Sequence, residues 1–388
     1  MPTPTATVVE PIDHSPSEIE SLPELAGHLS RGTIASLVVQ GLPLTDISLD
    51  AIDVTDALFV GCALTSEQVL DLIRRGAEVV PAFRGLPYPT QPSHLYTADE
   101  LAAGFEAGGF ATMYDTRVYR HYVAAGGATP SLREALAQRL HDHGIENALA
   151  ADTSFWVSQR GPASIVGVMG GHAEGRGTPA YRETARLAHM LAGAGKLILT
   201  GGGPGSMEAA NLGAYLASFP ASDLTGAIDR LAEAPDFRQH EAFTAATMDV
   251  RGRYVPDASL SWELRGGLSI PTWFFGHEPA NLFTAAAGKL FSNAVREELI
   301  LQFARGGIVF APGRAGTVQE VFQAANLTYY GIMKASGPFV FLDRHFWTNV
   351  VPVEPVLRPL LASSPLGDQS GLIVITDDIT EAFDLLTR

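Results

Sequence analysis

Pro312-Gly313-Arg314-Ala315-Gly316-Thr317-Val318-Gln319-Glu320 is the stretch of sequence that decides the fold. The apolar run 307–311 precedes it and is typical of a buried strand, and residues 321–327 continue it as a helix. When a strand is followed by a glycine-rich turn and a helix, the free N–H groups at the helix start converge on one point, where they favour binding of an anion. Glu320 adds a carboxylate near the start of that helix. The stretch therefore predicts an anion-binding turn with an acid beside it, suited to chemistry on a phosphorylated small molecule.

A second glycine-rich turn, Gly201-Gly202-Gly203-Pro204-Gly205-Ser206, lies upstream in a similar setting. Apolar runs at 163–169 and 196–200 predict two buried strands, and residues 180–192 between them predict a helix with one apolar face. Strand, helix and strand at this spacing predict a right-handed βαβ unit of a parallel sheet. Ligands of such sheets bind at the carboxyl ends of the strands, and both glycine-rich turns fall at such ends.

The fold class predicted from these patterns is α/β. We expect an arm over residues 1–20, which are rich in Pro, Thr and Ser, and a smaller N-terminal α/β domain over 21–152. Residues 153–388 are expected to form a Rossmann-like parallel sheet with helices on both faces. Further strands of this sheet are expected at 270–275, 339–342 and 372–376. Residues 220–268 are less regular, and a surface excursion and a lid over the cleft both stay open.

The N-terminal domain carries helix-start signals but no visible function. Capping boxes, which pair a Ser or Thr with a Glu or Gln three residues later, predict helix starts at 65–68, 97–100 and 131–134. No internal repeat is apparent, and the role of residues 1–152 stays open.

Composition limits the possible partners. Lys and Arg total 26 against 42 Asp and Glu, so the formal net charge of −16 disfavours general binding to nucleic acid or to an anionic membrane. The single cysteine, Cys62, excludes an internal disulfide and a cysteine metal cluster, and its apolar surroundings predict a buried structural thiol. No metal site is expected. No apolar run reaches the length of a membrane span and residues 1–16 lack a signal-peptide pattern, so we expect a cytoplasmic protein.

Two common nucleotide-binding patterns do not fit. The turn at 201–206 has Ser206 where the last small residue of a dinucleotide fingerprint belongs, follows the second strand of its unit, and contains Pro204. A dehydrogenase is therefore disfavoured. Neither glycine-rich turn is closed by a lysine followed by Ser or Thr, which argues against an ATPase or a kinase of the P-loop type.

The motif at 201–208, ending in Met207-Glu208, and the motif at 312–320 together resemble the paired signature of the LOG (Lonely Guy) family. Met169-Gly170-Gly171-His172 and Glu278-Pro279-Ala280-Asn281 are similar to sequences of the larger bacterial pyrimidine/purine nucleoside 5′-monophosphate nucleosidases. The resemblance covers roughly 160–388. It implies hydrolysis of the N-glycosidic bond of a nucleoside monophosphate to free base and ribose 5-phosphate, without a cofactor. It also implies a homo-oligomer, a dimer or tetramer.

The resemblance implies roles for particular residues. Glu320 matches the family's carboxylate near the ribose, where holding the sugar hydroxyls, orienting water and stabilising an oxocarbenium-like cation are all open. Arg296 matches the family's arginine and is expected to contact the base, the leaving group or the phosphate. Gly313, Gly316 and Thr317 would hold the 5′-phosphate. Residues expected to shape the site or to lie close to it are Gly170, Gly171, His172, Gly202, Gly203, Gly205, Glu208 and Asn281.

Each of these residues also has a purely structural explanation. Glu320 and Glu208 could each stabilise a helix dipole from the first turn. Arg296 could be a solvated helix residue, His172 a turn or packing residue, and the glycines could serve only tight turns. An amino-acid decarboxylase, the name often given to this family, is rejected because no lysine is marked for a pyridoxal Schiff base.

Two departures from the family pattern lie inside the motif at 312–320. Arg314 stands where the family usually has a second glycine, so it could change the turn or add a positive charge near the phosphate. Gln319 stands where many relatives have a second acid. A non-catalytic nucleotide-binding or cofactor-carrier protein on the same fold is therefore the alternative to the nucleosidase.

Overall fold

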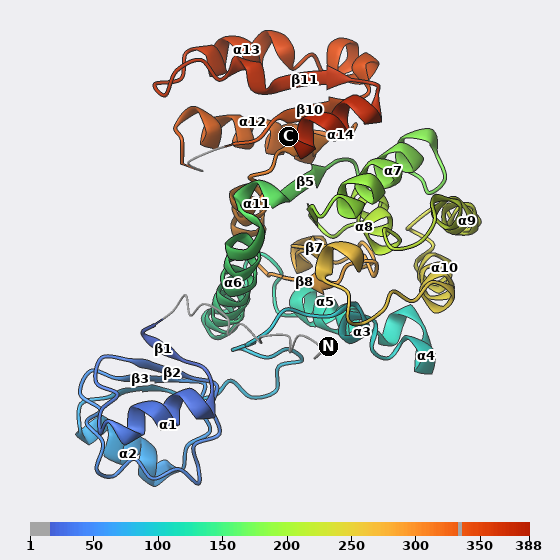
Figure 1. The fold of residues 1–388 in the computed structure, drawn as a ribbon. Helices are drawn as coiled ribbons and strands as arrows, with labels where there is room; N and C mark the ends of the chain where they lie inside the picture. Colours follow the sequence, from blue (N-terminus) through green and yellow to red (C-terminus); the bar gives the residue numbers. More distant parts are fainter. Residues whose placement is uncertain (1–15, 333–335) are drawn as a thin grey trace, which may run out of the picture. The chain divides into compact units, whose positions relative to one another are not determined.

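The computed structural model describes residues 16–332 and 336–388, which divide into two compact units (Figure 1). Unit 1 comprises the described residues up to His94 together with 129–155, and unit 2 comprises 95–128 and 156–388. Each unit contains one sheet whose paired strands are all parallel. The chain is thus α/β, as the sequence predicts. No helix within these described residues is both long and apolar enough to cross a membrane.

Unit 1 contains a four-stranded sheet in the order β1-β2-β3-β4. Its elements are β1 (Glu18–Ile19), α1 (Leu22–Ser30), β2 (Val38–Gln40), β3 (Leu58–Val60), α2 (Ser66–Arg74) and β4 (Glu78–Val80). The long helix α6 (Leu132–Arg160) contributes its residues up to 155 to this unit. Of the arm expected over residues 1–20, residues 1–15 lie outside the described chain, and Glu18–Ile19 form β1.

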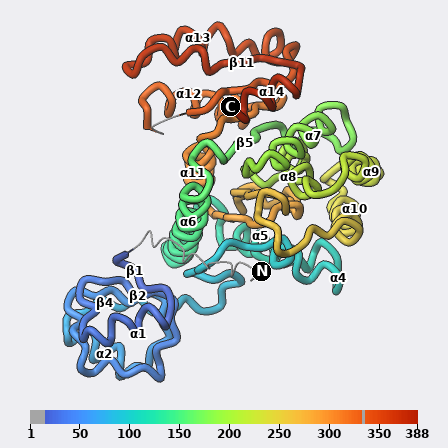
Figure 2. Tube along the Cα trace, viewed as in Figure 1, coloured from blue at the N-terminus to red at the C-terminus, as the bar shows by residue number. Residues whose placement is uncertain are grey.

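The strands of unit 1 follow a repeat of 20 residues, because Glu18, Val38, Leu58 and Glu78 are paired in register across the sheet. The turns share the period. Positive φ angles recur before the strands and after them, at Ser36, Asp56 and Gly76 and at Gly41 and Gly61. The expectation of no internal repeat is therefore wrong. Each 20-residue segment forms one coil, and the Cα trace shows the coils following one another (Figure 2). Their period is carried by backbone conformation and by buried positions, which different residue types fill from one coil to the next.

The predicted local features of unit 1 are largely confirmed. Cys62 is buried in the core of the coils, and burial raises the pKa of its thiol to about 11, as expected of a structural cysteine. Thr65 begins α2 with a reciprocal capping box to Gln68. At the start of α6, Ser131 Oγ accepts from the N–H of Glu134 at 3.5 Å.

Unit 2 contains a seven-stranded sheet in the order β11-β10-β9-β5-β6-β7-β8. Its strands are β5 (Ile165–Met169), β6 (Leu197–Thr200), β7 (Leu268–Ser269), β8 (Ala286–Ala287), β9 (Ile308–Phe310), β10 (Phe339–Leu342) and β11 (Ile373–Thr376). The chain adds β6, β7 and β8 on one side of β5, then returns to add β9, β10 and β11 on the other. The carboxyl ends of β5 and β9 therefore flank a topological switch point, where ligands of doubly wound sheets bind.

Helices cover both faces of this sheet, as expected (Figure 1). On one face, α7 (Pro179–Gly193), α8 (Ser206–Tyr215) and α14 (Ile379–Thr387) share a buried core with Val166, Val168 and Val309 of the strands. On the other face lie α11 (Asn293–Phe303), α12 (Ala315–Tyr329) and α13 (Glu354–Ala362), with Ala304 packed beneath Gly167 of β5. The two faces together bury the central strands, which explains their continuous apolar runs.

Residues 95–128 belong to unit 2, although the expected domain boundary at 152 places them in the N-terminal domain. They form α3 (Ala98–Ala102), α4 (Phe105–Gly108) and α5 (Tyr114–Ala124), and Thr97 starts α3 with the predicted capping box. Tyr96 forms an antiparallel bridge to Ala287 of β8, and Asp115 accepts a hydrogen bond from Trp273 Nε1 at 2.9 Å. These contacts join residues more than 150 positions apart. A local sequence pattern does not predict such contacts.

Two segments of unit 2 differ from the sequence prediction. The irregular-looking segment 220–268 contains two helices, α9 (Ala221–Leu231) and α10 (His240–Arg253), and α9 packs its buried side against α7. The strand expected at 270–275 is wrong: the sheet includes only Leu268–Ser269, and residues 273–275 form a 3₁₀ turn. Pro271 lacks the N–H that a longer strand needs, and Thr272 instead caps the turn through its side chain.

Gly213 of α8 sets how closely α7 and α8 pack. A methyl group on Gly213 would collide with the carbonyl oxygen of Ala185 and lie 2.9 Å from the backbone nitrogen of His189. We expect Gly213→Ala to lower the free energy of unfolding by about 1–3 kcal/mol, because the two helices must separate. The control, Gly226→Ala in α9, meets only Tyr254 Oη at 3.5 Å, so it should be neutral or stabilising. Urea denaturation compares the two variants, and equal stability would contradict this packing argument.

Candidate functional site

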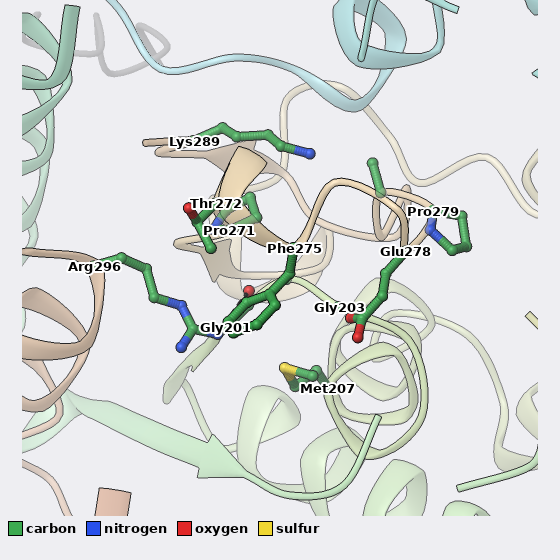
Figure 3. Close-up of a pocket in the computed structure, with 12 residues that line it drawn as sticks. Gly201, Gly203, Met207, Pro271, Thr272, Phe275, Glu278, Pro279, Lys289 and Arg296 are labelled. Carbon is green, nitrogen blue, oxygen red and sulfur yellow. Dashed lines mark hydrogen bonds between the residues drawn. The ribbon is translucent and has the colours of Figure 1, made fainter. Parts of the chain in front are cut away.

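A cleft lies in unit 2 at the carboxyl ends of β6 and β7 (Figure 3). Its lining combines a glycine-rich turn, several apolar side chains and three charged side chains: Gly201, Gly202, Gly203, Met207, Pro271, Thr272, Phe275, Glu278, Pro279, Ala280, Lys289 and Arg296. Of the residues selected from the sequence, Arg296, Gly202 and Gly203 therefore line the same cleft. Apolar walls around a few charged groups are typical of a small-molecule site.

Arg296 of α11 lines this cleft and connects the ends of β6 and β7. Its Nε donates to the carbonyl of Ile270 at 3.1 Å, and its Nη2 donates to the carbonyl of Gly201 at 3.4 Å. Its Nη1 lies 3.6 Å from Oε1 of Glu320. Since Arg296 is only 8% exposed, it is not a solvated helix residue. The structure thus brings together the two residues expected to carry the chemistry.

Glu320 is the sixth residue of α12, beyond the first helical turn, so the helix dipole does not explain it. Its side chain is 12% exposed, and burial raises the pKa of its carboxyl group to about 7. Glu297 raises this pKa further, whereas the positive charge of Arg296 opposes the rise. Near neutral pH, the Glu320 carboxyl therefore occurs in both protonation states, as suits an acid or a base.

Gln319 has a partner that explains its neutral side chain. Its Nε2 donates to Oε2 of Glu297 at 2.6 Å, and Nδ2 of Asn293 donates to the other carboxylate oxygen at 2.8 Å. Glu297 is buried and electrostatically coupled to Glu320. A second acid at position 319 would repel Glu297, so the amide at this position stabilises a carboxylate next to Glu320.

The predicted phosphate-binding turn begins α12. The first intrahelical bond runs from the N–H of Val318 to the carbonyl of Arg314 at 3.0 Å, so the N–H groups of Gly316 and Thr317 lie ahead of it. The buried Thr317 packs against Gly313, where any side chain would overlap it. Arg314 has a φ of −107°, which any residue adopts, and its side chain is exposed. Arg314 is therefore accommodated without backbone strain and adds a positive charge at the helix start.

The two glycine-rich turns meet at the end of β5. The N–H of Gly171 donates to the carbonyl of Pro312 at 3.0 Å, and the carbonyl of Gly171 accepts from the N–H of Ser206 at 3.2 Å. Gly205 has a φ of +72°, and a side chain there would overlap the carbonyl of Gly171. Gly170 packs against the Ser206 side chain. These glycines are thus needed for close approach of three strand ends at the switch point.

Glu208 and Asn281, expected near the site, have structural partners. Glu208 is 1% exposed and accepts two hydrogen bonds from the buried Arg176, at 2.8 and 2.5 Å, and one from Tyr181 at 3.0 Å. Asn281 donates to Oδ1 of Asn211 at 2.8 Å, and it accepts from the N–H of Phe283. Neither side chain lines the cleft.

The cleft also contains charged residues that were not selected from the sequence. Glu278 begins the motif Glu278-Pro279-Ala280-Asn281, of which the sequence predicts only Asn281 as a site residue. Lys289 is buried, and its Nζ lies 2.5 Å from Oδ1 of Asp115. A lone lysine within the apolar run 285–291 is a usable signal, because such a charge must be paired.

No family model matches the sequence, and a comparison with curated proteins gives no significant match.

Proposed function

We propose that the protein is a nucleoside 5′-monophosphate nucleosidase, a hydrolase that releases free base and ribose 5-phosphate. The observation that carries the proposal is the buried pair of Arg296 and Glu320 at the carboxyl ends of the strands. This pair belongs to the same unit as the start of α12, where an anion is favoured. A phosphate site joined to a buried acid supports chemistry on a phosphorylated sugar.

The proposed roles follow from the transition state. Breaking the bond between C1′ and the base leaves positive charge on the ribose, which a nearby carboxylate stabilises. Glu320 supplies that carboxylate and accepts a proton from the attacking water. Arg296 keeps Glu320 in place through their ion pair. The N–H groups of Gly316 and Thr317, with the charge of Arg314, hold the 5′-phosphate.

The purified protein tests the proposal directly. Incubation with AMP, GMP, IMP, CMP and UMP, followed by an assay for ribose 5-phosphate, should detect release from at least one of them. Tight binding of a nucleotide without release from any would instead favour the carrier alternative. Nucleosides without the 5′-phosphate are the matched control, and equal turnover of these would remove the phosphate site from the proposal.

The activity should depend on pH through Glu320. Below its pKa of about 7 the carboxyl group is neutral and neither stabilises the ribose cation nor accepts a proton from water. We therefore expect kcat/KM to fall as the pH decreases through about 7. The substrate phosphate titrates near pH 6, so a limb at that lower pH would report the substrate instead. A kcat/KM that does not change between about pH 6 and pH 8 would contradict the role of Glu320.

A further inference from the structure

Glu278 faces the cleft on the side away from Arg296. It follows the 3₁₀ turn at 273–275, and its side chain is 12% exposed. In Figure 3 its carboxylate points toward Gly203 and Met207, with the ring of Phe275 between it and Arg296. The lining of the cleft thus includes a carboxylate that the roles above do not use.

His172, at the end of β5, is the partner of this carboxylate. Its Nδ1 lies 3.3 Å from Oε1 of Glu278, and its ring meets Phe237 edge-on with centroids 5.9 Å apart. About half of the His172 side chain is exposed, so the pair connects the cleft with solvent. An imidazole between a buried carboxyl group and water can pass protons in either direction.

Burial shifts the pKa values of the two side chains in opposite directions. Burial raises the pKa of Glu278 above its ordinary value, although His277, Arg296 and Lys289 oppose the rise. Burial also lowers the pKa of His172, with help from the positive charges of Arg238 and Arg314. The two pKa values thus shift toward each other from their ordinary positions.

Arg296 connects the two acids of the site. It lines the same cleft as Glu278, and its Nη1 lies 3.6 Å from Oε1 of Glu320, so its positive charge opposes the rise in the pKa of each carboxyl group. Enzymes that cleave glycosidic bonds commonly use two carboxyl groups with different tasks. One protonates the leaving group, and the other acts at the anomeric carbon or on the water.

We propose that Glu278, with His172 as its proton partner, protonates the departing base, while Glu320 acts on the ribose and the water. The inference rests on the proposed nucleosidase function. The C1′–N bond breaks with its electron pair going to the base, which takes the proton of the Glu278 carboxyl group. Water forms the new bond to C1′ and gives its proton to Glu320, which releases it to solvent. His172 passes a proton from solvent to Glu278 and so restores the acid. The products are the neutral base and ribose 5-phosphate.

A substrate that needs no acid separates this role from binding. In 4-nitrophenyl β-D-ribofuranoside 5-phosphate, nitrophenolate leaves without a proton. We expect Glu278→Gln to lower kcat about 100-fold or more on the best nucleoside monophosphate. On the nitrophenyl substrate, the kcat of the same variant should stay within about threefold of the wild-type value. Retained nitrophenyl activity also proves that the variant folds.

Three further variants test whether His172 and an acid at position 278 are needed for proton transfer. His172→Gln should reduce turnover of the nucleoside monophosphate alone. The control His345→Gln removes an exposed histidine that follows β10 and does not line the cleft, and it should leave both reactions unchanged. Glu278→Asp, which keeps an acid, should retain more nucleotide turnover than Glu278→Gln.

Equal losses on both substrates, or equal nucleotide turnover by Glu278→Asp and Glu278→Gln, would overturn the inference. Wild-type protein that releases ribose 5-phosphate from no nucleotide would overturn the proposed function itself. The two failures are therefore distinguished by whether wild type or variant is inactive.

Discussion

Glu320→Gln is expected to lower kcat for nucleoside monophosphates by about 1,000-fold. The substitution keeps the shape of the side chain but removes the negative charge that stabilises the ribose cation and the base that accepts the water's proton. It also leaves Arg296 without its ion-pair partner at 3.6 Å. The measurement is initial-rate release of ribose 5-phosphate at pH 8, where wild-type Glu320 is mostly ionised.

A matched control is Glu298→Gln, which neutralises an exposed carboxylate two residues after Arg296 in α11. This variant should keep wild-type turnover. Binding of ribose 5-phosphate to Glu320→Gln, measured by calorimetry, should remain detectable because the phosphate contacts lie elsewhere. Turnover by Glu320→Gln within tenfold of wild type would remove Glu320 from the mechanism.

Arg176→Met is expected to cost about 3–5 kcal/mol of folding free energy, because it leaves the carboxylate of Glu208 buried without its counter-ion. Arg176 is 3% exposed, and it also donates to Thr247 Oγ1 at 2.6 Å and to the carbonyl of Phe243 at 2.9 Å. Removing the guanidinium therefore breaks a network that joins α8 to α10. Urea denaturation of the variant gives the loss.

Two further variants test the reason for that loss. Arg182→Ala breaks a more exposed ion pair, to Asp229, and should change the free energy of unfolding by less than about 1 kcal/mol. The double variant Arg176→Met/Glu208→Leu removes both charges and should recover much of the stability. A loss below 1 kcal/mol for Arg176→Met, or no recovery in the double variant, would contradict the argument.

The sequence was sufficient for the features that depend on local patterns. The apolar runs at 163–169 and 196–200, with the glycines that follow, predicted the centre of the sheet because a strand–turn–helix unit is specified by consecutive residues. Arg296 and Glu320 were selected together and lie 3.6 Å apart. The motifs predicted both residues for the site but not their ion pair, because Arg296 and Glu320 come from different helices.

The features that were missed depend on distant partners or on backbone shape. Glu208 looked like a residue near the site because its motif is adjacent, but its partner Arg176 is 32 positions away. Lys289 is held by Asp115, from a segment expected in another domain. The strand expected at 270–275 failed because an apolar run does not show that its backbone turns after Pro271.

The 20-residue period of unit 1 has a consequence for how its length can change. Each coil meets the next through the same register, so the stability of this part depends mainly on nearest-neighbour contacts. An insertion or deletion of one whole coil would preserve every turn and every buried position. A change of a single residue within a strand would instead shift the side chains that follow it in that strand by one place and turn buried residues outward. The register of this part is therefore preserved when its length changes by whole coils.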